Sequence, residues 1–455
     1  MDFLRNHSKQ SLLILALAVL GAALCAVFFP MESRTVADHL VGFPDSDPAT
    51  NQARPYVLGA LCFLPALAAF AYTLGGTLDR YIVRQFLGIF SLCVTGLFMI
   101  WLLIDLGDKI SDFSGSHHIL TTVVTYYATR SPAILLLLIP YSLLLALLYS
   151  LGKLSTHREI IAMIQAGRGI PRIALPLLCA GGFCTLFSLG LNYQWAPTAE
   201  GRQDEILAEA TGKAPTKASR VLYLNPDEQR MWMIGAFPPD YQKGRPLLNV
   251  EVTTSRADQT LQSRLFASEA TWNRNTREWT FTDAVVGRYA PGAPPEFVHP
   301  PDPLTIDNWS ETPWQLIKPG LSARYLGIPG LTTWLHSNSL HPEFADPKPY
   351  LTQWHYRWAL PFTCLVTVLL ATPLAIHFSR RGPGGGVFLA VVLSALMLLA
   401  TNIVLALGAS GTLPPAVAAW IPDVTFTLLG LYLFRRRITG RPIYHSLMHL
   451  LRAED

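Results

Sequence analysis

Charged residues are scarce in this sequence, and the scarcity is uneven. Asp, Glu, Lys and Arg make up 15% of the 455 residues, whereas soluble globular domains carry about 25%. Long stretches contain none of these residue types: 11–31, 55–78, 85–104, 131–152, 173–199, 358–379 and 382–422. Because a helix needs roughly 20 mostly apolar residues to cross a bilayer, the sequence excludes a soluble globular protein and predicts a polytopic α-helical membrane protein.

We predict about eight membrane spans. The segment GASGTLPP at 408–415 divides the longest uncharged stretch in two. The first run follows a basic lead, as a signal peptide does, but it is longer than a signal core and no small-residue cleavage site closes it, so we expect a retained span. The predicted spans lie at about 11–30, 56–77, 85–107, 131–151, 173–195, 356–378, 386–408 and 416–434.

Several signatures of enzymes and metal sites are also missing. The sequence contains no G-x-x-x-x-G-K-[ST], no H-E-x-x-H and no G-x-S-x-G, which excludes nucleotide hydrolysis by a P-loop and gives no support to those hydrolase classes. The cysteines all fall inside predicted spans: Cys25, Cys62, Cys93, Cys179, Cys184 and Cys364. We therefore expect no disulfide, no metal and no cofactor in this chain, and no nucleic-acid partner.

Lys and Arg gather on one side of the predicted spans. With the N-terminus in the cytoplasm, the inside segments hold Arg5, Lys9, Arg80, Arg84, Lys153, Arg158, Arg168, Arg172, Arg380, Arg381, Arg435, Arg436, Arg437, Arg441 and Arg452. The short outside loops hold only Arg34, Arg54, Lys109 and Arg130. This bias follows the positive-inside rule and predicts that both termini and the segment 152–173 are cytoplasmic.

The hydrophilic block 200–350 has the pattern of a β domain. Segments 219–225, 230–237, 247–254, 259–273 and 277–290 are rich in β-branched and aromatic residues and are separated by turn signals. Strands at this spacing predict a β-jelly roll or sandwich, placed on the outer side by the orientation above. Its interior is expected either to be packed or to open at one edge and hold a lipid.

A short amphipathic helix is predicted at 155–166, between two spans. Thr156 and Glu159 have the spacing of a capping box, Ile160 and Met163 belong to an apolar side, and glycines at 167 and 169 end the helix. Three interpretations remain open from the residues alone. Glu159 only caps the helix, or the helix docks onto a cytoplasmic partner, or its apolar and basic sides lie on anionic lipid.

Several motifs resemble the LptF/LptG family, the permease subunits of the lipopolysaccharide export ABC transporter. LDRYIVRQF at 78–86 is similar to the start of the family, and LLIPYSLLLALLYSLGKLSTHREIIAMIQAGRGIPRI at 137–173 to its second span and coupling helix. NYQWAPTAEGRQDEILAEA at 192–210 resembles the exit into its periplasmic domain. The segments 354–376 and 413–437 resemble its last spans. The order and topology agree over about 78–437.

The resemblance implies a six-span permease with a periplasmic β-jelly roll, preceded here by two extra N-terminal spans. Its implied partners are an ABC ATPase dimer that carries ATP and Mg²⁺, a second permease of the same family, periplasmic bridge proteins, lipopolysaccharide and the bacterial inner membrane. Within it, 155–166 corresponds to the coupling helix and Glu159 to the acid that enters the ATPase groove. We expect Arg158, Ile160 and Met163 to contact the ATPase with it.

The sequence departs from the family where some members bind lipid phosphates with basic residues. At the outer end of the 85–107 span it has Asp105 and Asp108, with Lys109 as the lone base. Together with Arg130, these residues are the candidate contacts for the lipid headgroup. Asp423, about two turns into the last span, is interpreted as an acid at the membrane interface.

The expected organisation has five parts: an extension with two spans at 1–77, a first permease group at 78–199, the β domain with a connecting helix at 200–350, a second permease group at 351–437 and a cytoplasmic tail at 438–455. The expected function is a non-enzymatic permease that extracts lipopolysaccharide from the inner membrane. Two alternatives are a membrane scaffold or sensor that transports nothing, and a lipid enzyme that uses Asp105, Asp108 or Asp423.

Overall fold

The computed structural model describes most of the chain. The described residues are 2–42, 47–114, 118–210, 215–225, 227–239, 241, 244–256, 258–273, 276–340, 346–376 and 384–439. The predicted tail beyond Thr439 lies outside them. So do Arg380 and Arg381, which entered the orientation argument.

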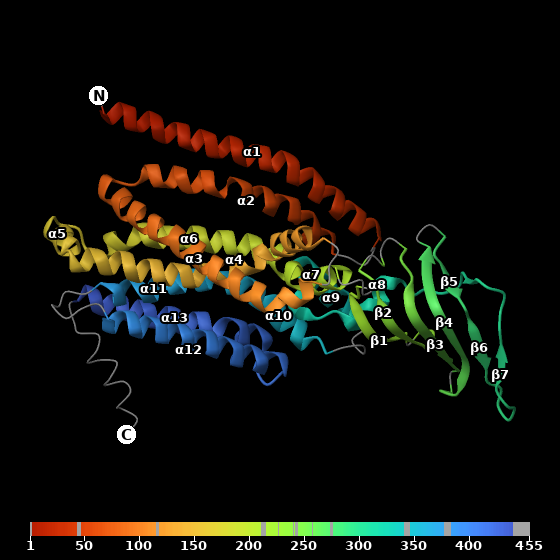
Figure 1. Ribbon diagram of the computed structural model, residues 1–455. Coiled ribbons are helices and arrows are strands. Elements are labelled where there is room, and N and C mark those ends of the chain that lie inside the picture. The colour runs from red at the N-terminus through yellow and green to blue at the C-terminus, as the bar shows by residue number, and fades with distance from the viewer. Residues whose placement is uncertain are drawn as a thin grey trace, which may run out of the picture.

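Eight helical segments of the described chain are long and apolar enough to cross a membrane, as the sequence predicts. They form one bundle, with the β domain at one end and the short helix α5 at the other (Figure 1). The spans are formed by α1 (Asp2–Gly42), α2 (Pro48–Leu74), α3 (Thr77–Ser114), α4 (Ile119–Thr156), α6 (Ile170–Tyr193), α10 (Lys348–Ala359) continued by α11 (Thr363–Ala375), α12 (Gly384–Ala409) and α13 (Pro415–Ile438). We refer to the β-domain end as the outer end.

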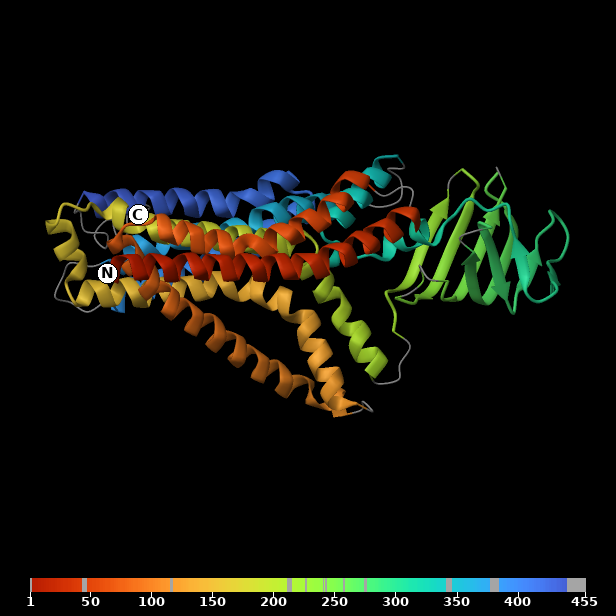
Figure 2. The same cartoon turned by 90° about the horizontal axis from the view of Figure 1, so that it is seen from above.

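The neighbouring helices α3 and α4 are longer than a bilayer requires. α3 and α4 have 38 residues each, or about 57 Å at 1.5 Å per residue, against a hydrocarbon core of about 30 Å. Their outer parts diverge from the other spans (Figure 2), and α4 packs there against α7 (Trp195–Ala210). Phe113, Tyr126 and Tyr127 form a small apolar cluster in this outer corner. The predicted span 85–107 therefore marks only the apolar middle of α3.

The N-terminal extension is a helical hairpin of α1 and α2. A Cβ atom on Gly21 would lie 2.7 Å from the carbonyl oxygen of Cys62, so the two backbones approach closely only because residue 21 is glycine. Nearer the outer end, Arg54 and Glu32 form an ion pair of 2.5 Å, and both side chains are largely buried. Each helix thus supplies polar and packing contacts to the other.

The hairpin packs against the permease through α2 and α6. Leu61 of α2 occupies the hollow beside Gly190 of α6, where an added Cβ would meet its side chain at 2.4 Å. The Tyr193 hydroxyl donates a hydrogen bond of 2.8 Å to the carbonyl of Thr50. These contacts attach α2 to the end of the first permease group.

The tip of the hairpin reaches the base of the β domain. The backbone N–H of Asp47 donates to Thr333 of α9 (Ile328–Leu340) at 3.2 Å. The ring of His39 packs edge-on against Trp314 of α8 (Pro313–Ile317). Burial, helped by the charge of Arg54, lowers the pKa of His39 to about 4, so this ring is neutral at pH 7 beside its apolar neighbour.

The outer domain is one antiparallel β-sheet of eight strands. The strands are β1 (Ala218–Asn225), β2 (Arg230–Phe237), β3 (Leu247–Ser255), β4 (Leu261–Asn273), β5 (Glu278–Thr282), β6 (Val285–Arg288), β7 (Glu296–Val298) and β8 (Leu304–Ile306). The main order is β1-β2-β3-β4-β5-β8, and the sheet branches at the long strand β4, which also pairs with β6, followed by β7. The predicted single strand 277–290 is wrong, because the chain turns at Asp283, where φ is 53°, and divides into β5 and β6.

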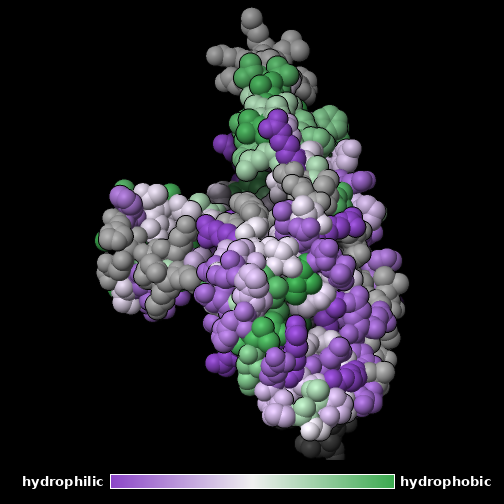
Figure 3. Space-filling view, turned by 90° about the vertical axis from the view of Figure 1, so that its right-hand side faces the viewer, coloured by the Kyte–Doolittle hydropathy of each residue, from purple (hydrophilic) through white to green (hydrophobic). Residues whose placement is uncertain are grey.

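The two faces of the sheet differ in burial. Trp232, Trp279 and Phe281 on the inner face are fully buried and in ring contact, so the inner face is packed here with aromatic side chains. The opposite face carries Leu222, which pairs with Met233, and both are exposed. Seen from the outer end, the surface is mainly hydrophilic with local apolar patches (Figure 3).

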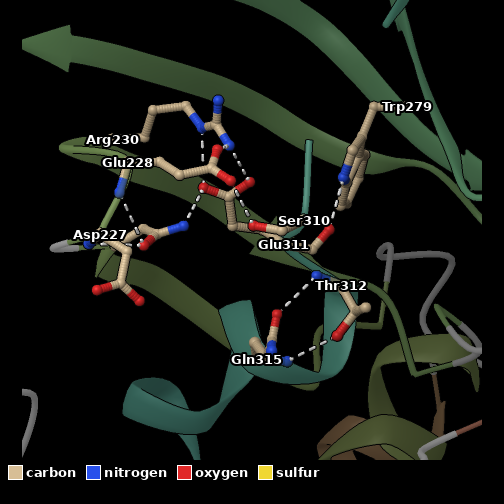
Figure 4. A network of polar contacts seen from close by, with 9 residues as sticks. Asp227, Glu228, Arg230, Trp279, Ser310, Glu311, Thr312 and Gln315 are labelled. Atoms are coloured by element: carbon tan, nitrogen blue, oxygen red, sulfur yellow. Dashed lines mark hydrogen bonds and ion pairs between the residues drawn. The ribbon is translucent and has the colours of Figure 1, made fainter. Parts of the chain in front are cut away.

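A polar network holds the segment after β8 to the sheet. Glu311, only 1% exposed, receives two hydrogen bonds of 2.9 Å from Arg230 and one of 2.8 Å from Asn225 (Figure 4). The indole N–H of Trp279 donates to the Glu311 carbonyl at 2.8 Å. Burial alone would raise the pKa of Glu311, but these hydrogen bonds and the charge of Arg230 outweigh it and hold that pKa below its ordinary value.

The capping box that opens α8 follows directly in the chain. Gln315 N–H donates to the Thr312 hydroxyl, and the Gln315 side chain accepts from the Thr312 N–H. The network and the cap together lead the chain from the sheet into the helices at its base.

A buried arginine joins the two permease groups below that base. Arg357 of α10 donates to the Asn192 side chain of α6 at 3.2 Å, while Asn192 donates to the Arg357 carbonyl at 2.6 Å. The guanidinium also donates to the carbonyl of Arg324. Arg357 is 6% exposed, so these bonds supply partners to a cation that is removed from water.

We expect Glu311→Ala to lower the free energy of unfolding by about 1–3 kcal/mol, because the change removes the buried partner of the Arg230 guanidinium and leaves it only the more exposed Glu228. The measurement is denaturant unfolding of the purified full chain, followed by tryptophan fluorescence. The control Glu296→Ala, on exposed β7, should change stability by no more than about 0.5 kcal/mol. Equal stability of the two variants would contradict the role of the network.

Because the pKa of Glu311 is lowered in the folded chain, the stability of the fold depends on pH in a defined direction. An acid whose pKa is lower in the folded than in the unfolded chain contributes its full stabilisation at a pH above its unfolded-state pKa, about 4.3. That stabilisation is lost as the pH falls through the folded-state pKa. We expect unfolding temperature to fall below about pH 4.3 more steeply in the parent chain than in Glu311→Gln. Parallel curves for the two proteins would show that Glu311 does not titrate as inferred.

Candidate functional site

The candidate site is the segment that joins α4 to α6 at the end opposite the β domain (Figure 1). Its helix α5 spans Glu159–Gln165, shorter than the predicted 155–166. The predicted capping box is wrong, because Thr156 still belongs to α4 and its hydroxyl donates to the Gly152 carbonyl at 2.9 Å. Arg158 instead precedes α5 with a left-handed backbone, φ 59°, and makes no side-chain cap.

Gly167 ends α5, as predicted. It has φ 86°, a conformation that glycine adopts at little cost. Its N–H bonds to the Ile164 carbonyl, and the N–H of Arg168 bonds to the Met163 carbonyl at 3.1 Å. This pair of bonds is a Schellman motif, which turns the chain sharply from α5 toward α6.

Two of the residues expected to contact the ATPase face the chain's own core. Ile160 is 0% exposed and Met163 is 6% exposed, and both pack in the core of the bundle with Leu154 and Ile170. These two side chains therefore have a packing role within the chain, and their predicted contact with the ATPase stays a prediction. They anchor α5 from within, and the exposed residues of the helix are Ala162, Ile164 and Gln165.

Glu159 lies at the first position of α5 and contacts another element. Its carboxylate accepts a hydrogen bond of 2.8 Å from the hydroxyl of Tyr81, in the first turns of α3. A carboxylate at a helix N-terminus also interacts favourably with the helix dipole. Arg158 beside it is exposed, so this corner of the segment presents an acid and a base together.

The other side of the segment contacts the same turns of α3. Asp79 is 8% exposed. Its carboxylate receives a hydrogen bond of 2.7 Å from Arg168, lies 3.7 Å from the guanidinium of Arg172, and accepts the Gly76 N–H at 3.1 Å. The first turns of α3 therefore contact the start of α5 through Tyr81, and the residues that follow α5 through Asp79. We call residues 157–172 the coupling segment and these contacts the α3 clamp.

The candidate headgroup residues lie at the outer corner of α3 and α4. Asp105 and Arg130 form an ion pair of 2.7 Å, and Tyr127 donates to Asp105 at 3.1 Å. The Arg130 guanidinium also lies 4.7 Å from the ring centre of Trp101. These two ions are thus engaged with each other, and they brace α3 against α4.

The remaining acids do not converge on one site. Asp108 is exposed on the diverging part of α3, and Lys109 lies 3.9 Å from Asp112. Asp423 is 7% exposed and packs within the bundle, and its interpretation as an acid at the membrane interface stays a prediction. Because α13 lies away from the outer part of α3 (Figure 2), the structure assembles no shared lipid-cleaving site from these acids.

The sequence reasoning missed the α3 clamp. Asp79 and Tyr81 belong to the LDRYI motif, but they stand some 80 residues before their partners. One signal was available in the sequence. The acid and the tyrosine stand at the start of a span, on the side predicted to be cytoplasmic, where the basic segment 152–173 is also expected. Among the described residues, no group of three or more His, Cys, Asp or Glu could hold a metal ion.

Comparison with known proteins gives one family match. The family described as "Lipopolysaccharide export system permease LptF/LptG" matches residues 80–436. The match starts within the first turn of α3 and ends in the last turn of α13, so α1 and α2 lie outside it. No curated protein matches the chain.

Cysteine labelling tests the placement of the coupling segment. We expect Gln165→Cys to react with a membrane-impermeant maleimide only from the cytoplasmic side, and Glu296→Cys on β7 only from the opposite side. Met163→Cys should stay unreactive from both sides, because this position is buried. The measurement is labelling in intact spheroplasts and in inverted vesicles, with the parent chain as background. Labelling of 165 and 296 from one side would contradict the orientation.

Proposed function

The chain belongs to the LptF/LptG family of lipopolysaccharide export permeases, and from this premise we propose that it is one half of an ABC exporter that extracts lipopolysaccharide from the bacterial inner membrane. The family is a membrane subunit of a transporter, not a catalytic enzyme. In the proposal a separate ATPase binds and hydrolyses ATP with Mg²⁺. The β domain lies in the periplasm and delivers the lipid to bridge proteins.

The geometry of the coupling segment carries the proposal. α5 is anchored from within by Ile160 and Met163, so its orientation relative to α4 and α6 is set by packing. Glu159 and Arg158 stand at its start, on the side away from that core. A charged corner on a rigidly held helix suits docking to an ATPase, since a force applied there passes to the spans without deforming the segment.

The exposure of α3 supports a second permease as partner. No residue of its most apolar stretch is buried within this chain, whereas 61% of the corresponding stretch of α4 is buried. α3 also diverges from the bundle toward the outer end (Figure 2). We propose that the second permease packs against this side, and that the lipid enters laterally between the two halves.

The β domain supports delivery from the outer end of the bundle. It continues directly from the spans through α7 and returns through α8 and α9. Moving acyl chains out of the membrane costs about 0.8 kcal/mol per CH₂ exposed to water, so an apolar route is needed. Because the inner face is filled by aromatic side chains, we propose that loading requires this face to open or a partner domain to complete the route.

The first experiment is co-purification from the native host through an affinity tag on this chain. We expect an ABC ATPase and a second permease with the parent chain, and loss of the ATPase with Glu159→Arg, because the reversal puts a cation where the ATPase would bind an acid. Glu296→Arg, the same reversal on the exposed strand β7, should keep all partners.

Each other result has a defined meaning. If no ATPase co-purifies with the parent chain in mild detergent, the exporter proposal is overturned and a scaffold that transports nothing is favoured. Retention of the ATPase by Glu159→Arg would leave the exporter standing and remove Glu159 from the docking surface.

A further inference from the structure

The α3 clamp joins the coupling segment to a span that has few other attachments. In the described part of α3 the buried side chains are Asp79, Ile82 and Phe86 near the cytoplasmic end, and Phe113 near the outer end. The residues between them are exposed or half-buried. Positions 79, 82 and 86 follow the spacing of one helix face, so α3 is held at a cytoplasmic anchor and at the outer corner.

The clamp is the polar part of that cytoplasmic anchor. Ile82 and Phe86 pack in the core that also holds Ile160 and Met163 of α5. This packing holds the buried face of α3 against the segment through many contacts that are individually weak. Asp79 adds a directional contact to this packing. The hydrogen bond of 2.7 Å from Arg168 weakens steeply when its N–H···O angle bends, so it favours one relative orientation of the two groups.

The carboxylate of Asp79 is also placed to make a strong interaction. It is largely removed from water, and two guanidinium groups and the Gly76 N–H surround it. Charge-assisted hydrogen bonds contribute about twice as much as neutral ones. Arg168 has the shorter contact and the less exposed side chain, at 31% against 58% for Arg172, so Arg168 is the principal partner.

We propose that Asp79 is a positioning residue that makes α3 turn with the coupling segment. When the ATPase moves α5, Arg168 carries the force to Asp79, and Tyr81 carries it from Glu159. α3 then turns between its cytoplasmic anchor and the outer corner, and its exposed middle opens and closes the lipid entry. This inference rests on the proposed function and assigns Asp79, Arg168 and Tyr81 a role in transmission rather than in docking.

The test measures lipopolysaccharide released per ATP hydrolysed by the whole complex, purified through this chain and reconstituted in vesicles that contain lipopolysaccharide. We expect Asp79→Asn and Arg168→Gln to lower this ratio about tenfold, the size expected for loss of a hydrogen bond between charged groups, while ATPase binding and hydrolysis persist. The double variant should be no worse than either single variant, because both changes remove the same interaction. Arg84→Gln, an exposed cation about one turn beyond the clamp on α3, is the matched control and should keep the parent ratio.

Three results would overturn the inference. Parent-like release per ATP in Asp79→Asn or in Arg168→Gln would show that the clamp transmits nothing. Losses that multiply in the double variant would show that the two residues act independently. A parallel fall in assembled complex and in hydrolysis, with an unchanged ratio, would assign Asp79 a purely structural role. Absence of an ATPase from the parent preparation would instead overturn the proposed function itself.

Discussion

The hydrocarbon of the bilayer imposes the constraint on which the rest of this structure depends. A backbone N–H or C=O without a partner costs several kcal/mol there, so the chain crosses as complete helices. The same cost confines polar side chains to the ends of the bundle or to its interior. Arg357 in α10 and Asp423 in α13 are accordingly buried among the helices. Segments that must interact with proteins or headgroups leave the bundle at its two ends.

Polar contacts at the two ends of the bundle hold α3, the span whose most apolar stretch contains no buried residue. At the end opposite the β domain Asp79 is paired with Arg168, and at the outer end Asp105 is paired with Arg130. Between these pairs α3 has little packing of its own within the chain. A helix attached at both ends and free in the middle can change its neighbours there without breaking its anchors. That property suits a span that faces a partner subunit and a passing lipid.

The N-terminal hairpin adds a connection that the family match does not include. α2 packs on α6 through Leu61 and Gly190, and its tip contacts α8 and α9 at the base of the β domain. It therefore touches the first permease group and the outer domain at once. The hairpin lies beside α6, while α3 diverges elsewhere (Figure 2). The side proposed for the second permease thus stays uncovered by the extension.

Sequence reasoning succeeded for elements whose hydrophobic pattern is clear within the segment itself. Hydrophobic length predicted the eight spans, and period-two alternation predicted β1 to β4 closely. It failed at 277–290, where a turn at Asp283 divides an apparently continuous strand. The strands β7 and β8 have three residues each, too few to show a period. β7 exists by pairing with β6, and β8 by pairing with β5.

By itself, the sequence determined the membrane class, the place of the β domain in the chain and the stop of α5 at Gly167, because hydropathy and backbone conformation act locally. Only the tertiary structure decided which side of α5 is buried and which residues Asp79 and Glu159 contact. The capping box failed for this reason, since α4 continued through Thr156 and Glu159 bonded to Tyr81. Such choices depend on which helices pack together, and the free energy of that packing is shared among residues far apart in the chain.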